Sequence, residues 1–119
     1  MRDFKNIKAW QLADKLTMQI YKLTKDFPKE ELYGITSQLR RAAVSVPANI
    51  AEGATRNSAK EYLQFLYIAK GSLAEAEYLI HLSHNLGYLT DSDFSHVDIM
   101  RTECAKTLYG LISSVGKEQ

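Results

Sequence analysis

Three side chains with the chemistry of metal ligands lie close together in the sequence. Glu77, His81 and His84 are spaced by four and three residues, so on a helix they would share one side. A di-iron bundle uses a Glu-x-x-His motif from each of two helices, together with further inward-facing carboxylates. This sequence has no such motif, and the remaining histidine, His96, lies near the start of another predicted helix. We therefore interpret the histidines as surface residues, with a metal site as the weaker alternative, and expect no cofactor.

The single cysteine is a second candidate for chemistry, as a nucleophile. Cys104 lies in an apolar stripe with Val97 and Leu108, where a buried thiol behaves as a small hydrophobic side chain. A catalytic thiol would need an activating histidine or cation beside it, and the sequence places none there. The glycines are isolated from one another, so no glycine-rich phosphate loop is present. We predict no catalytic residue and expect that the protein is not an enzyme.

Positive side chains are the third group, because they could contact the phosphates of RNA or DNA. Residues 1–60 contain 11 Lys and Arg against 6 Asp and Glu, whereas residues 61–119 contain 4 against 8, although the net charge is only +1. The candidate nucleic-acid-binding residues are Arg40, Arg41, Arg56 and Lys60, together with Lys5, Lys8 and Lys15. The alternatives are that these side chains are only solvated, or that the oppositely charged halves complement each other within or between chains.

The composition describes the protein that must position these groups. A chain of 119 residues with 45% hydrophobic and 24% charged residues is typical of one globular domain, 1–119. One cysteine cannot form an internal disulfide, which fits a reducing cytoplasm. The N-terminus lacks the apolar run of a signal peptide, and no apolar stretch is long enough to span a bilayer. We expect a cytoplasmic protein with no membrane partner.

Helical periodicity of apolar residues recurs in four segments, and strand-like alternation is missing. The segments cover about 6–26, 58–86 and 90–113, together with a second one that starts between 30 and 35 and ends near 53. Residues 113–119 are expected to fray. Short links favour antiparallel neighbours, so we predict an all-α, antiparallel up-down-up-down four-helix bundle. The expected N-caps are Asn6, Ser58 within an S-x-x-E capping box, and Thr90 or Asp91.

The predicted core rows follow spacings of three and four residues. They are Ala9, Ala13, Leu16, Ile20, Leu23 and Phe27; Leu39, Ala43, Val46 and Ile50; Tyr62, Leu66, Ala69, Leu73, Ala76 and Ile80; and Val97, Met100, Cys104, Leu108, Leu111 and Val115. Pro47 lies inside the second pattern, where it removes one backbone hydrogen bond and crowds the carbonyl of Ala43. We predict a kink in one helix, with two shorter helices as the alternative.

Two helices carry more apolar or uncharged surface than one core needs. The third segment has apolar residues well away from its core row, which suggests a second buried face. On the second segment, small residues run beside the core stripe, while a polar row from Gln38 to Arg56 runs on its other side. Exposed apolar surface usually marks contacts, so we predict a subunit interface. Its candidate residues are Val44, Ala48, Asn49, Glu52, Ile68 and Leu79.

Several runs of the sequence resemble one bacterial protein family. They are YGITSQLRRAAVSVPANIAEG at 33–53, FLYIAKGSL at 65–73 and LGYL at 86–89, with Trp10, Ala13, Phe27, Pro28, Arg56 and Ser58 as further matches. Together they resemble the four-helix-bundle proteins encoded in intervening sequences of 23S ribosomal RNA genes, from Phe4 to about Leu111. The resemblance implies a homopentamer. A related branch comprises accessory proteins of diversity-generating retroelements, which bind nucleic acid and a reverse transcriptase.

The positive side chains, the predicted interface and the family resemblance together lead to one expectation about function. We expect a non-enzymatic oligomeric bundle protein that serves as a nucleic-acid-binding adaptor for RNA or DNA, with a reverse transcriptase as a further candidate partner. The alternative is a protein-binding scaffold with no nucleic-acid role.

Overall fold

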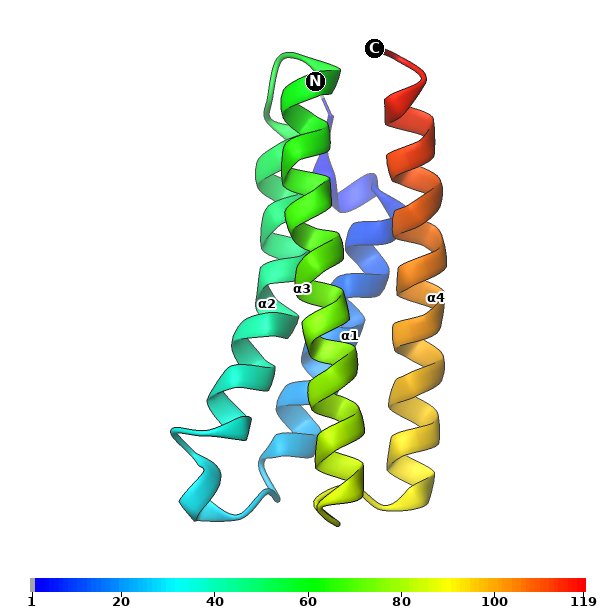
Figure 1. The fold of residues 1–119 in the computed structure, drawn as a ribbon. Coiled ribbons are helices and arrows are strands. Elements are labelled where there is room, and N and C mark those ends of the chain that lie inside the picture. The colour runs from blue at the N-terminus through cyan, green and yellow to red at the C-terminus, as the bar shows by residue number, and fades with distance from the viewer. Residues whose placement is uncertain (1) are drawn as a thin grey trace.

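Four long helices make up most of the computed structural model, which describes residues 2–119. They are α1 (Lys8–Thr24), α2 (Ile35–Ala54), α3 (Ala59–Asn85) and α4 (Asp91–Gly116), and the short 3-10 turns η1 (Phe4–Asn6) and η2 (Lys29–Glu31) precede α1 and α2. No strand occurs in residues 2–119. The prediction of an all-α four-helix bundle is confirmed. Figure 1 shows successive helices running in opposite directions, with the two chain ends at the same end of the bundle.

The helices follow one another around the bundle. α1 packs on α2 and α4, and α3 packs on α2 and α4, whereas α1 and α3 lie diagonally across from each other without close backbone contact. Each helix therefore has two neighbours and one outward face. The outward faces of α1 and α3 lie on opposite sides of the molecule.

The starts of α3 and α4 follow the predicted capping chemistry. Ser58 Oγ accepts a hydrogen bond from the backbone N–H of Glu61 at 3.2 Å, and Thr90 Oγ1 accepts one from Asp93 N at 3.0 Å. Each bond satisfies one of the amide groups that the first helical turn leaves unpaired. The predicted N-caps Ser58 and Thr90 are confirmed.

Two predicted helix ends are wrong. Asn6 is not an N-cap, because it belongs to η1, which Asp3 caps, and α1 begins after Ile7. The fourth helix does not fray from residue 113. It continues to Gly116, because Val115 is only 3% exposed and packs into the core.

Most of the predicted core positions are buried, and all six members of the α3 row are among them. The exceptions are Leu23, Met100 and Leu111, which are half-buried at the edge of the core. Leu79 requires a larger correction, since it was assigned to the subunit interface but is only 4% exposed. A helix that packs on two neighbours buries a wider arc than one core row, and Leu79 lies within that arc.

α2 continues through Pro47 as a single helix, so the alternative of two shorter helices is wrong, while the kink stays a prediction. Proline has no N–H to donate to the carbonyl four residues earlier, and that carbonyl belongs to Ala43. Thr17 of α1 supplies the missing donor, since its Oγ1 lies 3.0 Å from Ala43 O and 2.8 Å from Ala13 O. The single hydroxyl proton is shared between a carbonyl of its own helix and one of α2.

We expect Thr17→Val to destabilise the protein by about 1–2 kcal/mol, because it leaves the buried Ala43 carbonyl without a donor. Pro47→Ala restores a helical N–H for that carbonyl, so Thr17→Val should cost less in the Pro47→Ala background. Chemical denaturation of the four proteins measures the coupling, expected at about 1 kcal/mol. Equal losses in both backgrounds would show that Thr17 does not replace the missing amide.

Candidate interaction surfaces

Arg40 and Arg41 are adjacent in sequence but lie on different sides of α2. Arg40 lies toward α1, where its Nε donates to Thr24 Oγ1 at 2.8 Å and its guanidinium lies 4.8 Å from the centre of the Tyr21 ring. Arg41 lies toward α3 and lines a depression there with Ser72. Consecutive residues of a helix point about 100° apart, which explains the separation.

Arg56 and Lys60 lie far from Arg40. The fourteen-residue step from Arg40 to Ala54, where α2 ends, corresponds to about 21 Å along the helix, and Arg56 follows two residues later. The guanidinium of Arg56 lies 4.5 Å from the centre of the Phe65 ring, and its Nη2 pairs with Glu52 Oε1 at 3.1 Å. The four predicted nucleic-acid-binding residues therefore do not form one cluster, and their role in binding stays a prediction.

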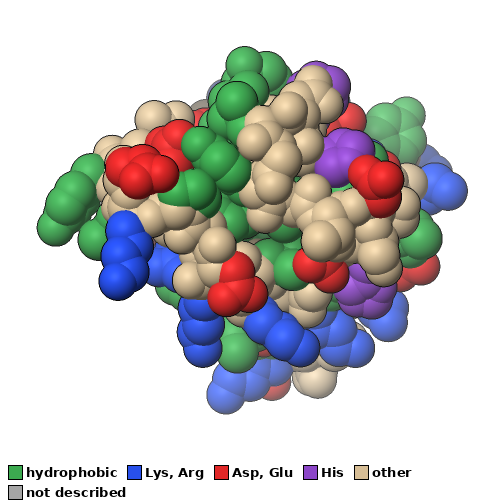
Figure 2. Space-filling model, turned by 90° about the horizontal axis from the view of Figure 1, so that it is seen from below, with side chains coloured by type: hydrophobic (Ala, Val, Ile, Leu, Met, Phe, Trp, Pro, Cys, Tyr) green, Lys and Arg blue, Asp and Glu red, His purple; other side chains and the backbone are tan. Residues whose placement is uncertain are grey.

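A more continuous positive surface lies along the outward face of α1. Lys8, Lys15, Lys22 and Lys25 are all exposed, and none of them forms an ion pair within residues 2–119. The first three recur every seven residues, which is about 10 Å of helix, so they stay on one side. In Figure 2, which looks along the bundle from below, Lys and Arg side chains gather along the lower edge. We call Lys8, Lys15, Lys22 and Lys25 the lysine face.

Sequence reasoning included Lys8 and Lys15 as candidates but missed Lys22 and Lys25. The spacing of seven residues from Lys8 to Lys22 was the signal that could have found this face.

The predicted subunit interface on α2 is partly exposed and partly used within the chain. Val44 is 41% exposed, and Ala48 and Glu52 are also exposed. Asn49 is half-buried, and its amide donates to Ser45 O at 2.8 Å and Ser45 Oγ at 3.0 Å. Ser72 of α3 also donates to Ser45 Oγ, at 2.8 Å. This part of the polar row therefore joins α2 to α3.

α3 carries the largest share of exposed apolar surface outside the lysine face. Tyr67 is 56% exposed and Tyr78 is 58% exposed, with Gly71 and Ala74 between them on the same side of the helix. Ile68, a predicted interface residue, is 51% exposed beside them. The third helix therefore carries exposed apolar residues beside its core row, and their role in a subunit interface stays a prediction. We call the exposed α3 residues Tyr67, Ile68, Gly71, Ala74 and Tyr78 the apolar face.

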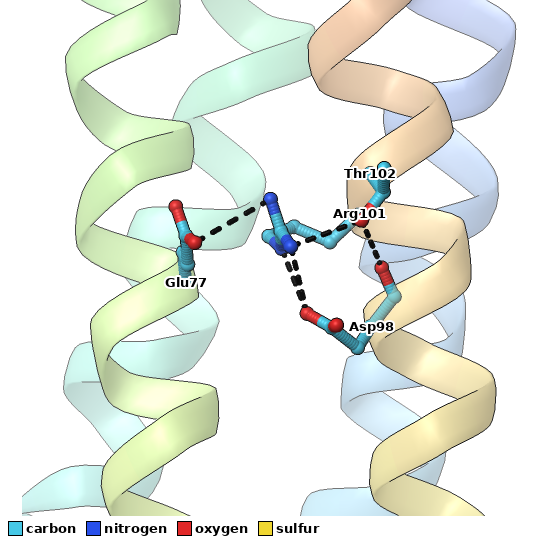
Figure 3. A network of polar contacts seen from close by, with 4 residues as sticks. All are labelled: Glu77, Asp98, Arg101 and Thr102. Atoms are coloured by element: carbon cyan, nitrogen blue, oxygen red, sulfur yellow. Dashed lines mark hydrogen bonds and ion pairs between the residues drawn. The ribbon is translucent and has the colours of Figure 1, made fainter.

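Arg101 joins α3 and α4 beside a groove of about 290 Å³ whose floor includes Leu73 and Leu108. Its side chain is only 15% exposed, and Nε and Nη2 donate to Asp98 Oδ1 at 3.0 and 2.8 Å. Its Nη1 reaches Glu77 Oε2 across the helices at 3.6 Å (Figure 3). Glu77, which the sequence placed in a candidate metal site, therefore pairs with an arginine.

His84 and His81 contact neighbouring side chains. His84 Nε2 lies 2.7 Å from Asp91 Oδ1, and its ring stacks on Phe94 with the ring centres 4.1 Å apart. His81 is within hydrogen-bond distance of Asn85, at 3.1 Å. Residues 2–119 contain no group of three or more His, Cys, Asp or Glu side chains that could hold a metal ion. Over the same range no helix is long and apolar enough to cross a bilayer.

Cys104 is fully buried, and this burial raises the pKa of its thiol to about 11. Burial disfavours the charged thiolate, which is the nucleophilic form of cysteine. The thiol therefore acts as part of the core.

Comparisons with known proteins give a family match and a similar fold. A family model described as 23S rRNA-intervening sequence protein matches residues 5–110. The fold is similar to that of a crystal structure of a protein with unknown function from the S23 ribosomal protein family of Bacteroides thetaiotaomicron. The two chains share 24% sequence identity with a TM-score of 0.81, over 88% of this chain and 95% of that one. No curated protein sequence matches significantly.

We expect Cys104 to react with a thiol reagent at neutral pH far more slowly in the folded protein than in denaturant, because the folded thiol is buried and protonated. The same shift makes stability depend on pH. The contribution of this thiol is complete below the ordinary pKa of 9.0 and is lost as the pH rises through about 11. Labelling with Ellman's reagent measures the rates. Equally fast labelling of the folded protein would contradict the burial.

Proposed function

The chain belongs to the family of 23S rRNA-intervening sequence proteins, and on that basis we propose that it is a non-enzymatic, oligomeric adaptor that binds RNA or DNA. The observation that carries the proposal is the lysine face, an exposed row of cations on one side of α1. Phosphates of a nucleic acid placed along this row would meet one ammonium group about every 10 Å. The contact would be electrostatic and tolerant of sequence, because a lysine that contacts a phosphate reads no base.

The low net charge of +1 is compatible with this role because part of the negative charge lies far from α1. Glu61, Glu75 and Glu77 are on α3, which is diagonal to α1, and within residues 2–119 Asp14 is the one acidic residue that lines the groove along α1 with Lys15 and Lys22. Screening by salt limits charge interactions to about 10 Å, so a strand on the lysine face would interact mainly with α1. The charge close to α1 therefore affects binding of a nucleic acid more than the net charge of the whole chain does.

Self-association is the second part of the proposal. The apolar face lies on α3, diagonally across the bundle from α1, so copies could join there and leave α1 outward. The small residues Gly71 and Ala74 would let a helix of another copy approach closely. A pentamer is the assembly that the sequence resemblance suggests. Several lysine faces on one particle would strengthen weak binding by avidity.

The proposal that the protein is not an enzyme rests on its cysteine and on one of its histidines. The thiol of Cys104 is buried and protonated, and His84 is engaged with Asp91 and Phe94. A nucleophile needs a base within hydrogen-bond reach, and Cys104 makes no such contact within residues 2–119.

A protein-binding scaffold is the alternative function, and the exposed tyrosines favour it. Tyr67 and Tyr78 offer rigid aromatic surface of the kind enriched at protein interfaces. A partner such as a reverse transcriptase could bind there.

We predict that Lys8→Gln, Lys15→Gln and Lys22→Gln combined weaken binding of RNA or DNA. Each lost phosphate contact should lower the slope of log affinity against log salt by about 0.9 for duplex DNA, so three contacts lower it by about 3. Fluorescence anisotropy over a salt series measures both the affinity and the slope.

The matched control for these lysines is Lys70→Gln, Lys106→Gln and Lys117→Gln combined. It removes the same charge from exposed lysines outside the lysine face, so its salt slope should equal that of the unchanged protein. If both triple variants lose binding equally, only net charge matters, and the lysine face is not the binding surface.

A second prediction concerns assembly. Light scattering should give a mass several times that of the 13.5 kDa chain, and Ala74→Glu should reduce it, because it places a charge in the apolar face. Ser95→Glu, at an exposed position of α4, should leave the mass unchanged. A monomer at micromolar concentration would refute self-association.

A further inference from the structure

A pocket of about 310 Å³ lies where α1 ends and α2 begins. Its apolar wall includes Phe27 and Leu32, and its charged lining residues are Lys25, Lys29 and Arg40, with no carboxylate among the lining residues. Apolar walls with a few placed polar groups are typical of ligand pockets, and this volume is near the lower end of their range. The pocket therefore suits a small anionic ligand with one flat apolar group.

Arg40 is held in position to bind an anion. Its Nε donates to Thr24 Oγ1 at 2.8 Å, and its guanidinium lies over the Tyr21 ring at 4.8 Å. No hydrogen bond or ion pair within residues 2–119 uses its two Nη groups. A guanidinium fixed through Nε and ring stacking can offer its remaining N–H groups to a phosphate without further ordering.

Thr36 also lines this pocket. The residue is only 3% exposed, and its Oγ1 is buried with no hydrogen-bond partner among residues 2–119. A buried hydroxyl without a partner is costly, and such atoms are rare in folded proteins. A nucleobase that enters the pocket and displaces the side chains covering this hydroxyl would supply the partner.

The pocket is continuous with the lysine face. Lys25 lines both this pocket and a shallow groove along α1 that Lys15, Lys22 and Tyr21 also line. A strand whose phosphates follow α1 would therefore reach the pocket at its end. Tyr33, which follows Leu32 in the chain, is 92% exposed and could stack with a neighbouring base.

We propose that the pocket between α1 and α2 holds one unstacked nucleotide of a single-stranded nucleic acid whose phosphates follow the lysine face. This inference rests on the proposed nucleic-acid binding and adds its substrate class. A base within a duplex is paired and stacked, so it would have to be extruded to enter the pocket. The lysine face alone would favour duplexes, because their charge density is higher. If the pocket binds a nucleotide, the protein should therefore prefer single strands to duplexes.

The test compares a dye-labelled oligothymidylate with a blunt-ended DNA duplex by fluorescence anisotropy at low salt. The unchanged protein should bind the single strand about tenfold more tightly than the duplex. Thr36→Val keeps the side-chain shape and removes the unpaired hydroxyl, so it should weaken single-strand binding severalfold and leave duplex binding unchanged. Thermal unfolding of this variant should show no loss of stability, because the hydroxyl has no partner to lose.

Arg40→Gln and Arg41→Gln form a matched pair, because they remove the same charge from adjacent positions on different sides of α2. The first should reduce the preference for the single strand, and the second should leave it unchanged. Equal or tighter duplex binding, or a preference that Thr36→Val does not alter, would refute the pocket. The lysine face would still stand if the triple lysine variant lost binding. Absence of binding to either nucleic acid would refute both.

Free thymidine monophosphate provides the last arm of the experiment. A single nucleotide lacks the contacts along α1, so it should displace the strand only at concentrations far above the dissociation constant of the strand. Displacement near that concentration would assign the pocket to a free nucleotide and overturn the single-strand proposal.

Discussion

The Ala43 carbonyl is the point on which the arrangement of α1 depends. Pro47 removes the amide that would have bonded to it, and the buried carbonyl takes its hydrogen bond from Thr17 instead. Thr24, seven residues later, makes the second link by accepting from Arg40. Both threonines therefore face α2. Residues two apart on a helix point about 200° apart, so turning Thr17 inward turns Lys15 outward. The hydrogen bond that completes α2 also determines which side of α1 meets solvent.

This orientation separates the two surfaces on which the proposed function depends. The lysines of α1 recur every seven residues, like the threonines, and lie on the outer side of the helix. The apolar face lies on α3, which is diagonal to α1. Assembly through the apolar face would leave the lysine face free, and each added copy would add one more row of lysines. At the end of that row lies the pocket beside Arg40, whose Nε donates to Thr24, the second of the two threonines that face α2.

The sequence predicted the parts of the structure that depend on local chemistry. Leu66 and Ile80 follow the helical period, and Ser58 and Thr90 carry cap side chains, so helices and core could be read directly. Leu79 was misplaced because its burial depends on two neighbouring helices at once. Arg40 and Arg56 were grouped by residue type, although the helix from Arg40 to Ala54 already separates them by about 21 Å. The Thr17–Ala43 bond and the unpaired hydroxyl of Thr36 depend on how helices meet, which periodicity alone cannot show.

Lysine footprinting tests the central claim most directly, because it maps the nucleic-acid contact on the unmodified protein. The protein is acetylated briefly with and without an excess of oligothymidylate, and mass spectrometry compares each lysine. We expect the nucleic acid to protect Lys8, Lys15, Lys22 and Lys25, together with Lys29 at the pocket. The modification of Lys70, Lys106 and Lys117 should not change. Protection of the lysines on α3 and α4 instead, or equal protection of all lysines, would contradict the account.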